Sequence, residues 1–336
     1  MLQINKDGLQ TTVQDLGRKG FQKYGVIASG AMDPYAHRLA NILVGNKETD
    51  PTIEITLMGP HITFLEECLI TLTGGDLSPS LDGILVKMWR PILVRKGCKL
   101  TFGMPVSGCR TYLAVAGGFV VSEVMGSHST YLRAGIGGFE GRALKKGDVI
   151  QVGECSGFIK TFIAGLSKDG NKNSFIQMDW TLKTQVIPKY GSETSVRIID
   201  GRQAHLFDEK SKDAIFTQAF QTSSDSDRMG YRMIGPKLVL KEPKELLSEA
   251  VSFGSIQVPP DGQPIILMAD RQTTGGYPKI GQVATVDLNK VSQLKPGEFL
   301  RFERVSLELA QNELVKERKL IEQLKQSISL KYKEGN

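Results

Sequence analysis

Short apolar runs, each bounded by Gly, Pro, Asn or Asp, recur along most of the chain. Many of them are rich in β-branched residues, a pattern typical of strands that pack against a core. We therefore expect a mainly β protein, a β-rich α+β fold in which strands clearly outnumber a few short helices. The predicted strands are 53–57, 69–73, 92–95, 99–102, 111–116, 149–152, 195–200, 237–240, 251–258 and 264–269.

Two internal helices interrupt this pattern. Asp33 suits an N-cap, Pro34 suits the first helical position, and apolar residues then recur at helical spacing until Gly45. A second, shorter helix is predicted over 287–294, because a Pro-Gly pair follows it closely.

The C-terminal residues 306–330 contain neither Gly nor Pro. Their apolar side chains fall at heptad-like spacing, which predicts an amphipathic helix. We favour packing of this helix on its own domain. Contact with a second copy of the chain, which would make a homo-oligomer, is the alternative. The apolar positions are Leu307, Ala310, Leu314, Ile321, Leu324 and Ile328.

A polar, irregular stretch between 164 and 192 indicates a domain boundary. The chain has 336 residues, enough for about two domains of 100–200 residues each. We predict a β-rich N-terminal domain over 1–190, a second β-rich domain over 191–305 and a helical tail over 306–336.

Composition excludes several classes of function. The 42 Lys and Arg exceed the 36 Asp and Glu by only six, and the excess is spread thinly, so no nucleic-acid surface is expected. No apolar run is long enough to span a membrane, and the N-terminus lacks a signal pattern. The 4 Cys and 4 His show no metal-ligand spacing, so we expect no metal site and a reduced, cytoplasmic protein.

Motifs for common cofactor and nucleophile chemistry are absent from the sequence. There is no P-loop, no dinucleotide-binding glycine pattern after a strand, and no nucleophile elbow. Val86-Lys87-Met88 lacks the first of the two methionines that flank a biotinylated lysine. The chain is therefore not expected to carry biotin itself.

Three segments concentrate groups that could do chemistry. Residues 29–32, Ser-Gly-Ala-Met, lead directly into the helix that Asp33 caps, and such a turn presents backbone N–H groups to an anion. Residues 268–279 begin at the end of a very apolar strand and contain a dense series of polar side chains, which favours a site over a simple turn. In 223–232, Asp225 or Asp227 could act as a general base, although an ion pair of either with Arg228 or Arg232 is the simpler interpretation.

Five long motifs resemble one family. They are TTVQDLGRKGFQKYGVIASGAMD (11–33), EITLMGP (54–60), TYLAVAGG (111–118), SDRMGYR (226–232) and IQVPPDGQPIILMADRQTTGGYPKIG (256–281). The family is the biotin-dependent carboxyltransferase-like group that includes KipA, also called allophanate hydrolase subunit 2 and, in bacteria, the C subunit of 5-oxoprolinase. The resemblance covers roughly residues 1–305 and implies a cyclophilin-like β-barrel architecture.

The resemblance also implies activity and partners. Stand-alone members are similar to the third subunit of an ATP-dependent 5-oxoprolinase, which hydrolyses the lactam of 5-oxo-L-proline to glutamate. Their partners are a KipI-like B subunit and a LamB/YcsF-like A subunit, and ATP is used by the complex. One alternative is a carboxyltransferase subunit that acts on urea or another amide, with biotin on a carrier protein. Another is a regulatory protein that antagonises a KipI-like kinase inhibitor.

A planar amide is common to these reactions, and it assigns roles to the polar segments. We expect 29–32 and 271–274 to face each other across one cleft. The predicted catalytic residues are Asp33, Asp227, Arg271 and Lys279. The predicted substrate-binding residues are Ser29, Gly30, Ala31, Met32, Arg228, Gln257, Gln272, Thr273 and Thr274. One departure from the family is Arg202, which stands where relatives tend to have proline and adds a cation near this cleft.

Overall fold

The computed structural model describes residues 1–168 and 173–334. Two compact units are formed. We call Met1–Gly17, Asp33–Lys189 and Lys319–Asn336 the sandwich unit, and Arg18–Met32 with Tyr190–Arg318 the barrel unit. Residues 18–32 therefore group with the C-terminal part of the chain, although they precede the sandwich unit's first helix. The predicted division into 1–190, 191–305 and 306–336 stays a prediction.

The sandwich unit contains two sheets that share one core. Alternate residues of facing strands, such as Ile53 and Ile55 from one sheet and Ile62 and Phe64 from the other, are fully buried together. Period-two alternation therefore directs one face of each sheet inward. The seven-stranded sheet has the order β11 (Phe119–Val120), β12 (Val149–Val152), β1 (Leu2–Lys6), β4 (His61–Phe64), β9 (Lys99–Thr101), β6 (Ser80–Leu81), β7 (Ile84–Leu85). The six-stranded sheet has the order β13 (Phe175–Gln177), β8 (Pro91–Val94), β5 (Cys68–Asp76), β10 (Ser107–Val115), β3 (Thr52–Thr56), β2 (Gln10–Gln14).

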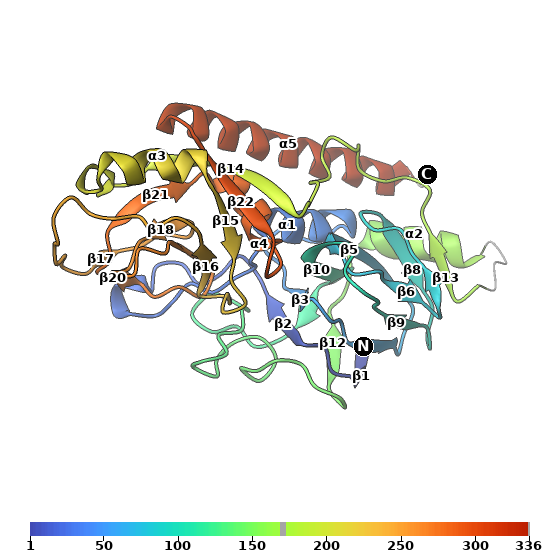
Figure 1. Ribbon diagram of the computed structural model, residues 1–336. Coiled ribbons are helices and arrows are strands. Elements are labelled where there is room, and N and C mark those ends of the chain that lie inside the picture. Colours follow the sequence, from blue (N-terminus) through green and yellow to red (C-terminus); the bar gives the residue numbers. More distant parts are fainter. Residues whose placement is uncertain (169–172, 335–336) are drawn as a thin grey trace. The chain divides into compact units, whose positions relative to one another are not determined.

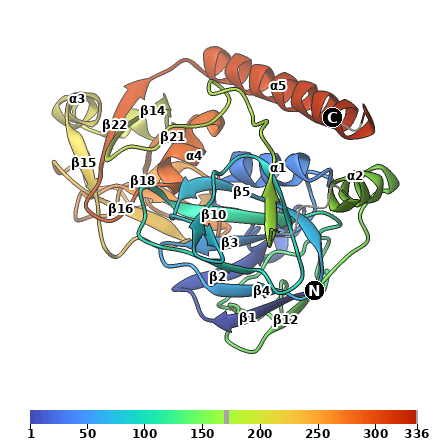
Figure 2. The same cartoon turned by 90° about the vertical axis from the view of Figure 1, so that its right-hand side faces the viewer.

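Helix α1 (Pro34–Leu43) covers the outer face of the six-stranded sheet (Figure 2). The Asp33 carboxylate accepts a hydrogen bond from the Ala36 N–H at 2.9 Å, so the predicted N-cap and helix are confirmed. Helix α2 (Gly157–Lys168) was not predicted.

The barrel unit is a closed seven-stranded barrel (Figure 1), which confirms the mainly β, barrel-containing fold class. Its parallel pair, β14 with β22, closes the ring, and its interior is a separate apolar core. The order is β14 (Glu193–Asp200), β21 (Lys279–Val283), β18 (Ser255–Gln257), β19 (Ile265–Leu267), β16 (Gly230–Ile234), β15 (Ala219–Thr222), β22 (Phe299–Arg304). A two-stranded ribbon of β17 (Glu249–Ala250) and β20 (Thr274–Gly275) is separate from the ring.

Most predicted strands and helices are confirmed, with local corrections. The run 237–240 is not a strand and contributes only a bridge between Leu240 and Phe207, because its backbone bonds to loops on either side. The run predicted as a strand over 251–258 is a strand only at β18, because Gly254 has φ +84° and a turn precedes it.

The helix predicted at 287–294 is α4 (Leu288–Ser292), and the C-terminal helix is α5 (Leu307–Glu334). Helix α3 (Glu209–Thr217) and three short 3-10 turns at Gln22–Tyr24, Ala204–Leu206 and Thr285–Asp287 complete the fold. The last two residues of the predicted tail, 335–336, lie outside the described residues.

No helix in 1–168 or 173–334 is long and apolar enough to cross a membrane.

Candidate functional site

A buried ion pair joins two of the predicted segments. Arg228 is 4% exposed and forms a bidentate pair with Asp270, at 2.9 Å from Nε to Oδ2 and 3.0 Å from Nη2 to Oδ1. Its Nη2 also donates to the carbonyl oxygen of Gly30 at 2.6 Å. The turn at 29–32 and the loop that begins at Asp270 are thus tied to one guanidinium inside the barrel unit.

The backbone explains why Arg228 and Asp270 meet. Strands β16 and β19 pair through Gly230 and Leu267, and backbone bonds continue beyond the strands, with the Asp270 N–H donating to the Arg228 carbonyl at 2.8 Å. Asp227 is exposed and its carboxylate accepts the N–H groups of Met229 (2.7 Å) and Gly230 (3.2 Å). Of the expected ion pairs, the one with Arg228 is replaced by the pair with Asp270, because the side chain of Asp227 caps the turn while that of Arg228 is buried against Asp270. In the described ranges Arg232 forms no ion pair with Asp225 or Asp227 either.

The turn at 29–32 has an unusual backbone. Ser29 has φ +53°, which a residue with a side chain rarely adopts, and Gly30 has φ +99°. The Ser29 hydroxyl is buried and bonds to no residue in the described ranges. Ala31 and Met32 are buried, and Met32 belongs to the core of the barrel unit. The hydrogen bond from Arg228 to Gly30 and the packing of Met32 in the core thus fix the turn, and the buried Ser29 hydroxyl has no hydrogen-bond partner in the described ranges.

Arg271 follows the ion pair directly and lacks a carboxylate partner of its own. Its Nη1 donates to the Met268 carbonyl at 3.2 Å, and its guanidinium carbon lies 5.7 Å from the centre of the Phe253 ring. Within the described parts of the chain, no acidic oxygen comes within 4.0 Å of it. Burial lowers the pKa of Arg271, and the charge of Asp270 opposes that change. A half-buried cation of this kind can bind an anion or a developing oxyanion.

A second polar cluster surrounds Lys279. Its Nζ lies 2.6 Å from Glu249 Oε1, and the same oxygen accepts from Gln203 Nε2 at 2.6 Å. Gln203 Oε1 in turn accepts the Lys279 backbone N–H at 3.3 Å, and the exposed Arg202 binds the other Glu249 oxygen at 2.9 Å. The hydrogen bond from Lys279, followed by that from Gln203, lowers the pKa of Glu249. Arg202 and Lys279 thus share the carboxylate of Glu249, and the position of this extra cation near the predicted cleft stays a prediction.

Gln257 lies opposite Lys279 on the neighbouring strand, where β18 pairs with β21. Its amide Nε2 donates to the Tyr277 carbonyl at 3.4 Å. A Cβ on Gly275 would lie 2.5 Å from this nitrogen, so only glycine lets the ribbon pack so closely over the amide. Gln257, Lys279 and the 271–278 loop therefore form one packed group.

The barrel unit contains all but one of the predicted site residues. Gln272 and Thr274 are exposed and Thr273 is half-buried, so these side chains line the outer part of the loop. Asp33 belongs to the sandwich unit, is fully buried and caps α1. Its backbone N–H donates to the Tyr112 hydroxyl at 2.8 Å. The structure thus gives Asp33 a capping role, and its predicted catalytic role stays a prediction.

Three polar residues of these clusters were not assigned a role from the sequence. Asp270 lies within the polar segment 268–279, but nothing in that segment indicates its partner Arg228, which is 42 residues away in sequence. Gln203 precedes a short 3-10 turn and Glu249 lies in the two-residue strand β17, neither with a periodic pattern, and only the three-dimensional pairing with Lys279 identifies them.

The segment around Asp15, part of the first family motif, is structural in this molecule. The Asp15 carboxylate accepts hydrogen bonds from the Ser127 and Ser129 hydroxyls and from the His128 and Gly17 N–H groups. Burial is the largest single influence and raises the pKa of Asp15, but these hydrogen bonds together hold it below the ordinary value. Asp15 therefore fixes a loop of the sandwich unit.

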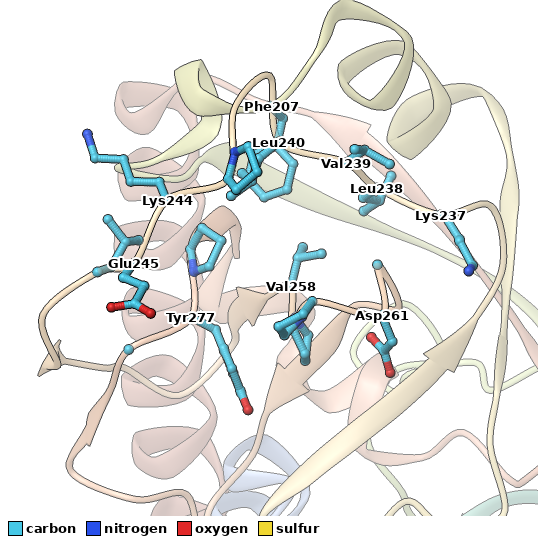
Figure 3. Close-up of a pocket in the computed structure, with 17 residues that line it drawn as sticks. Phe207, Lys237, Leu238, Val239, Leu240, Lys244, Glu245, Val258, Asp261 and Tyr277 are labelled. Atoms are coloured by element: carbon cyan, nitrogen blue, oxygen red, sulfur yellow. The ribbon is translucent and has the colours of Figure 1, made fainter.

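A cavity of about 700 Å³ lies beside the Lys279 cluster in the barrel unit (Figure 3). Its walls are mainly apolar and include Phe207, Leu240 and Val258. Figure 3 shows Lys244 and Glu245 at one end and Lys237 and Asp261 at the other. The loop segment from Gly276 to Pro278 forms part of the wall.

Comparison with known proteins gives a consistent family. Residues 24–304 match the model of the carboxyltransferase domain, subdomain A and B. The C subunit of the Escherichia coli 5-oxoprolinase is 40% identical over 324 residues, which are 96% of this chain and 97% of that relative. The C subunit of the Haemophilus influenzae 5-oxoprolinase is 39% identical over 302 residues, 90% of each chain.

Larger enzymes contain a similar part. The solved urea amidolyase of Kluyveromyces lactis matches with a TM-score of 0.85 and 30% identity, over 96% of this chain and 20% of that one. The urea amidolyase of Saccharomyces cerevisiae is 34% identical over 91% of this chain. The chain spans only 17% of that yeast protein.

Proposed function

The chain belongs to the carboxyltransferase domain family, subdomains A and B, and from this premise we propose that it is the C subunit of an ATP-dependent 5-oxoprolinase. The observation that carries the proposal is the similarity to two proteins of that name, at 39–40% identity over nine tenths or more of both chains. The urea amidolyases share less identity, and this chain accounts for a fifth or less of their length.

The reaction opens 5-oxo-L-proline to L-glutamate. Phosphoryl transfer from ATP to the lactam oxygen, with release of ADP, would activate the ring carbon. Water would then add to that carbon, the lactam C–N bond would break as the ring nitrogen gains a proton, and a second water would hydrolyse the resulting acyl phosphate to carboxylate and phosphate. Negative charge develops on the lactam oxygen and on the phosphoryl group, so the site needs fixed positive donors.

The barrel unit offers such donors. We assign Arg271 to the developing oxyanion, because its guanidinium has no carboxylate partner in the described chain and is half-buried. The Arg228–Asp270 pair holds the turn at 29–32, and we assign to an anionic group its Ser29 hydroxyl, which is buried and has no hydrogen-bond partner in the described ranges. We assign Gln257, Lys279 and the side chains of 272–274 to orientation of the planar amide.

Proton transfer is the second requirement. Asp227 is exposed, and its Oδ1 accepts two backbone N–H groups. We assign the proton relay to Asp227 through its other oxygen and leave Asp33 as the cap of α1.

Partner proteins complete the proposed enzyme. We propose a KipI-like B subunit and a LamB/YcsF-like A subunit, with this chain inactive alone and ATP used in the complex. A second candidate function is carboxyl transfer to urea or another amide from biotin carried on a different protein. The likeness to solved urea amidolyase favours it, and the same donors would then bind the carboxyl group.

Glutamate release from 5-oxo-L-proline and ATP tests the proposal. The three proteins are mixed, and each is omitted in turn. We expect activity only in the full mixture and a fall of about 10²–10³-fold with Arg271→Ala, the range for loss of one oxyanion donor. Arg301→Ala is the matched control, since Arg301 is exposed on β22 and its ion pair in the described part of the chain is with the exposed Glu193.

Other outcomes would redirect the assignment. Activity without this chain, or full activity of Arg271→Ala, would contradict the proposal. Activity only with urea, bicarbonate and a biotin carrier would favour the second function. No activity despite tight binding of the KipI-like protein would favour a regulatory antagonist.

A further inference from the structure

Arg271 is held by an aromatic ring and a carbonyl oxygen. Its guanidinium carbon lies over the Phe253 ring, 5.7 Å from the ring centre, and a cation and an aromatic face attract each other within roughly 6 Å. Its Nη1 donates to the Met268 carbonyl at 3.2 Å. In the parts of the chain that the structure describes, Nε and Nη2 of Arg271 donate to no other group. The Phe253 ring is therefore a main contact of this guanidinium.

The partner of an arginine decides what the arginine can still bind. In the same unit, Arg228 donates to both carboxylate oxygens of Asp270 and to a backbone carbonyl, and the carboxylate cancels its charge. An aromatic face attracts a guanidinium without accepting its in-plane N–H groups and without adding a negative charge. Arg271 therefore keeps both its charge and its donors for an anion or a developing oxyanion.

Gln282, on the strand next to β18, fixes the turn that carries Phe253. Its Nε2 donates to the Phe253 carbonyl at 2.7 Å, and its Oε1 accepts from the Ser255 hydroxyl at 2.8 Å. The same hydroxyl accepts from the Ser252 N–H at 3.1 Å, and the Ser255 N–H donates to the Ser252 carbonyl at 3.1 Å. One carboxamide is thus bonded to two residues of a turn that is itself closed by hydrogen bonds.

Phe253 and Arg271 are anchored beside the same end of one strand. The N–H of Gly254, the residue after Phe253, donates at 2.7 Å to the carbonyl of Leu267, the last residue of β19. The carbonyl of the next residue, Met268, accepts both Nη1 and the backbone N–H of Arg271, each at 3.2 Å. The ring and the guanidinium meet because their two segments bond to consecutive carbonyls.

We propose that Phe253 is a positioning residue for Arg271, and that its ring holds the guanidinium where the lactam oxygen gains negative charge. This inference rests on the proposed function, in which Arg271 stabilises that oxygen. Phe253 acts only through Arg271. Its ring should therefore affect the rate of the reaction more than the affinity for the substrate, because the oxyanion develops only in the transition state.

Two substitutions test the ring itself. Phe253→Leu removes the ring and keeps an apolar side chain, whereas Phe253→Tyr keeps the ring. In glutamate release by the complete mixture, Phe253→Leu should lower kcat about tenfold, within the range of a cation–π contact, and should change KM for 5-oxo-L-proline by less than about twofold. Phe253→Tyr should keep kcat close to that of the wild type. Phe216→Leu is the matched control, because the Phe216 ring lies 4.4 Å from the guanidinium carbon of Arg304 in the same unit, and its loss should leave kcat and KM unchanged.

Two further measurements separate positioning from a general structural effect. In a chain that already carries Arg271→Ala, Phe253→Leu should cause no additional loss of rate, because the residue that the ring positions is gone. In the full chain alone, phenylglyoxal should modify Arg271 at least about threefold faster in Phe253→Leu than in the wild type or in Phe253→Tyr, because the ring no longer holds and covers the guanidinium. Peptide mass spectrometry measures this modification.

The outcomes for the inference and for the proposed function are distinct. An unchanged kcat in Phe253→Leu, an equal fall in Phe253→Tyr, or an additional loss beyond that of Arg271→Ala would overturn the positioning role. Absence of glutamate release by the wild-type mixture would refute the 5-oxoprolinase function. Phenylglyoxal would then decide the inference, since faster modification of Arg271 in Phe253→Leu supports the positioning role and an unchanged rate overturns it.

Discussion

Loss of Arg228 should destabilise the barrel unit more than loss of any exposed arginine. Arg228 donates charge-assisted hydrogen bonds to both carboxylate oxygens of Asp270 and to the Gly30 carbonyl. Both partners of the ion pair are under 10% exposed. Arg228→Met leaves the Asp270 carboxylate buried without its cation, and removal of one partner of such a pair costs about 3–5 kcal/mol.

The expected change in melting temperature follows from the size of the unit. A domain of 150–250 residues loses about 2–4 °C per kcal/mol, so Arg228→Met should lower the melting temperature by roughly 6–20 °C. Differential scanning calorimetry of the chain measures this. The control Arg301→Met removes an exposed pair and should cost at most about 1 kcal/mol.

The double variant Arg228→Met with Asp270→Leu separates burial of an unpaired charge from loss of packing. It should be more stable than Arg228→Met alone, because no unpaired carboxylate remains buried. Two results would refute the pair as the anchor of the turn at 29–32. One is a free energy of unfolding for Arg228→Met within about 1 kcal/mol of that for Arg301→Met. The other is a double variant that is less stable than Arg228→Met by as much as Asp270→Leu alone destabilises the wild type.

Three further results are expected. Asp15→Asn should lower the free energy of unfolding at neutral pH, as measured by urea denaturation. The difference from the wild type should shrink as the pH falls below about 4 toward the lowered pKa of Asp15, because this carboxylate stabilises the fold only while it is ionised. A difference that does not depend on pH would contradict this. Glu249→Gln should reduce glutamate release at neutral pH. The activity of this variant should also fall less steeply at acid pH than that of the wild type, because the wild-type Glu249–Lys279 pair is lost as the pH falls through the lowered pKa of Glu249. An unchanged pH profile would show that the pair takes no part in the reaction. Gly201→Ala should destabilise the barrel by about 2 kcal/mol or more, because the added Cβ would lie 2.3 Å from the Lys279 carbonyl oxygen, and equal melting temperatures would show that the strand moves freely.

Local patterns in the sequence predicted the local parts of the fold. The Asp33 cap and the helix after it depend on neighbouring residues, so spacing alone identifies them. Strand runs were predictable for the same reason, and 237–240 failed because an apolar run that lines a cavity has the same composition as a strand. The barrel itself was expected from family resemblance rather than from periodicity.

Distant pairings explain why the site was only partly predictable. Gly30 and Arg228 are 198 residues apart in sequence, and nothing in either segment indicates the other. The acidic residues next to Arg228 in sequence suggested a local ion pair, yet the turn geometry directs it to Asp270. Glu249 lies in a polar stretch of ordinary composition that forms the two-residue strand β17, so its role beside Lys279 emerges only when β17 pairs with β20.

The closure of the barrel has a consequence for synthesis. Strand β22 pairs in parallel with β14 over Glu193–Ile198 and antiparallel with β15, so the last strand joins both ends of the ring. A ribosome-bound chain cannot complete this ring before Arg304 has emerged, and until then β14 and β15 each present an open edge. The contacts between β14 and β22, whose partners lie more than 100 residues apart in sequence, form slowly, and the incomplete chain is the form most exposed to aggregation. Chains that terminate before β22 should therefore require chaperones or be degraded.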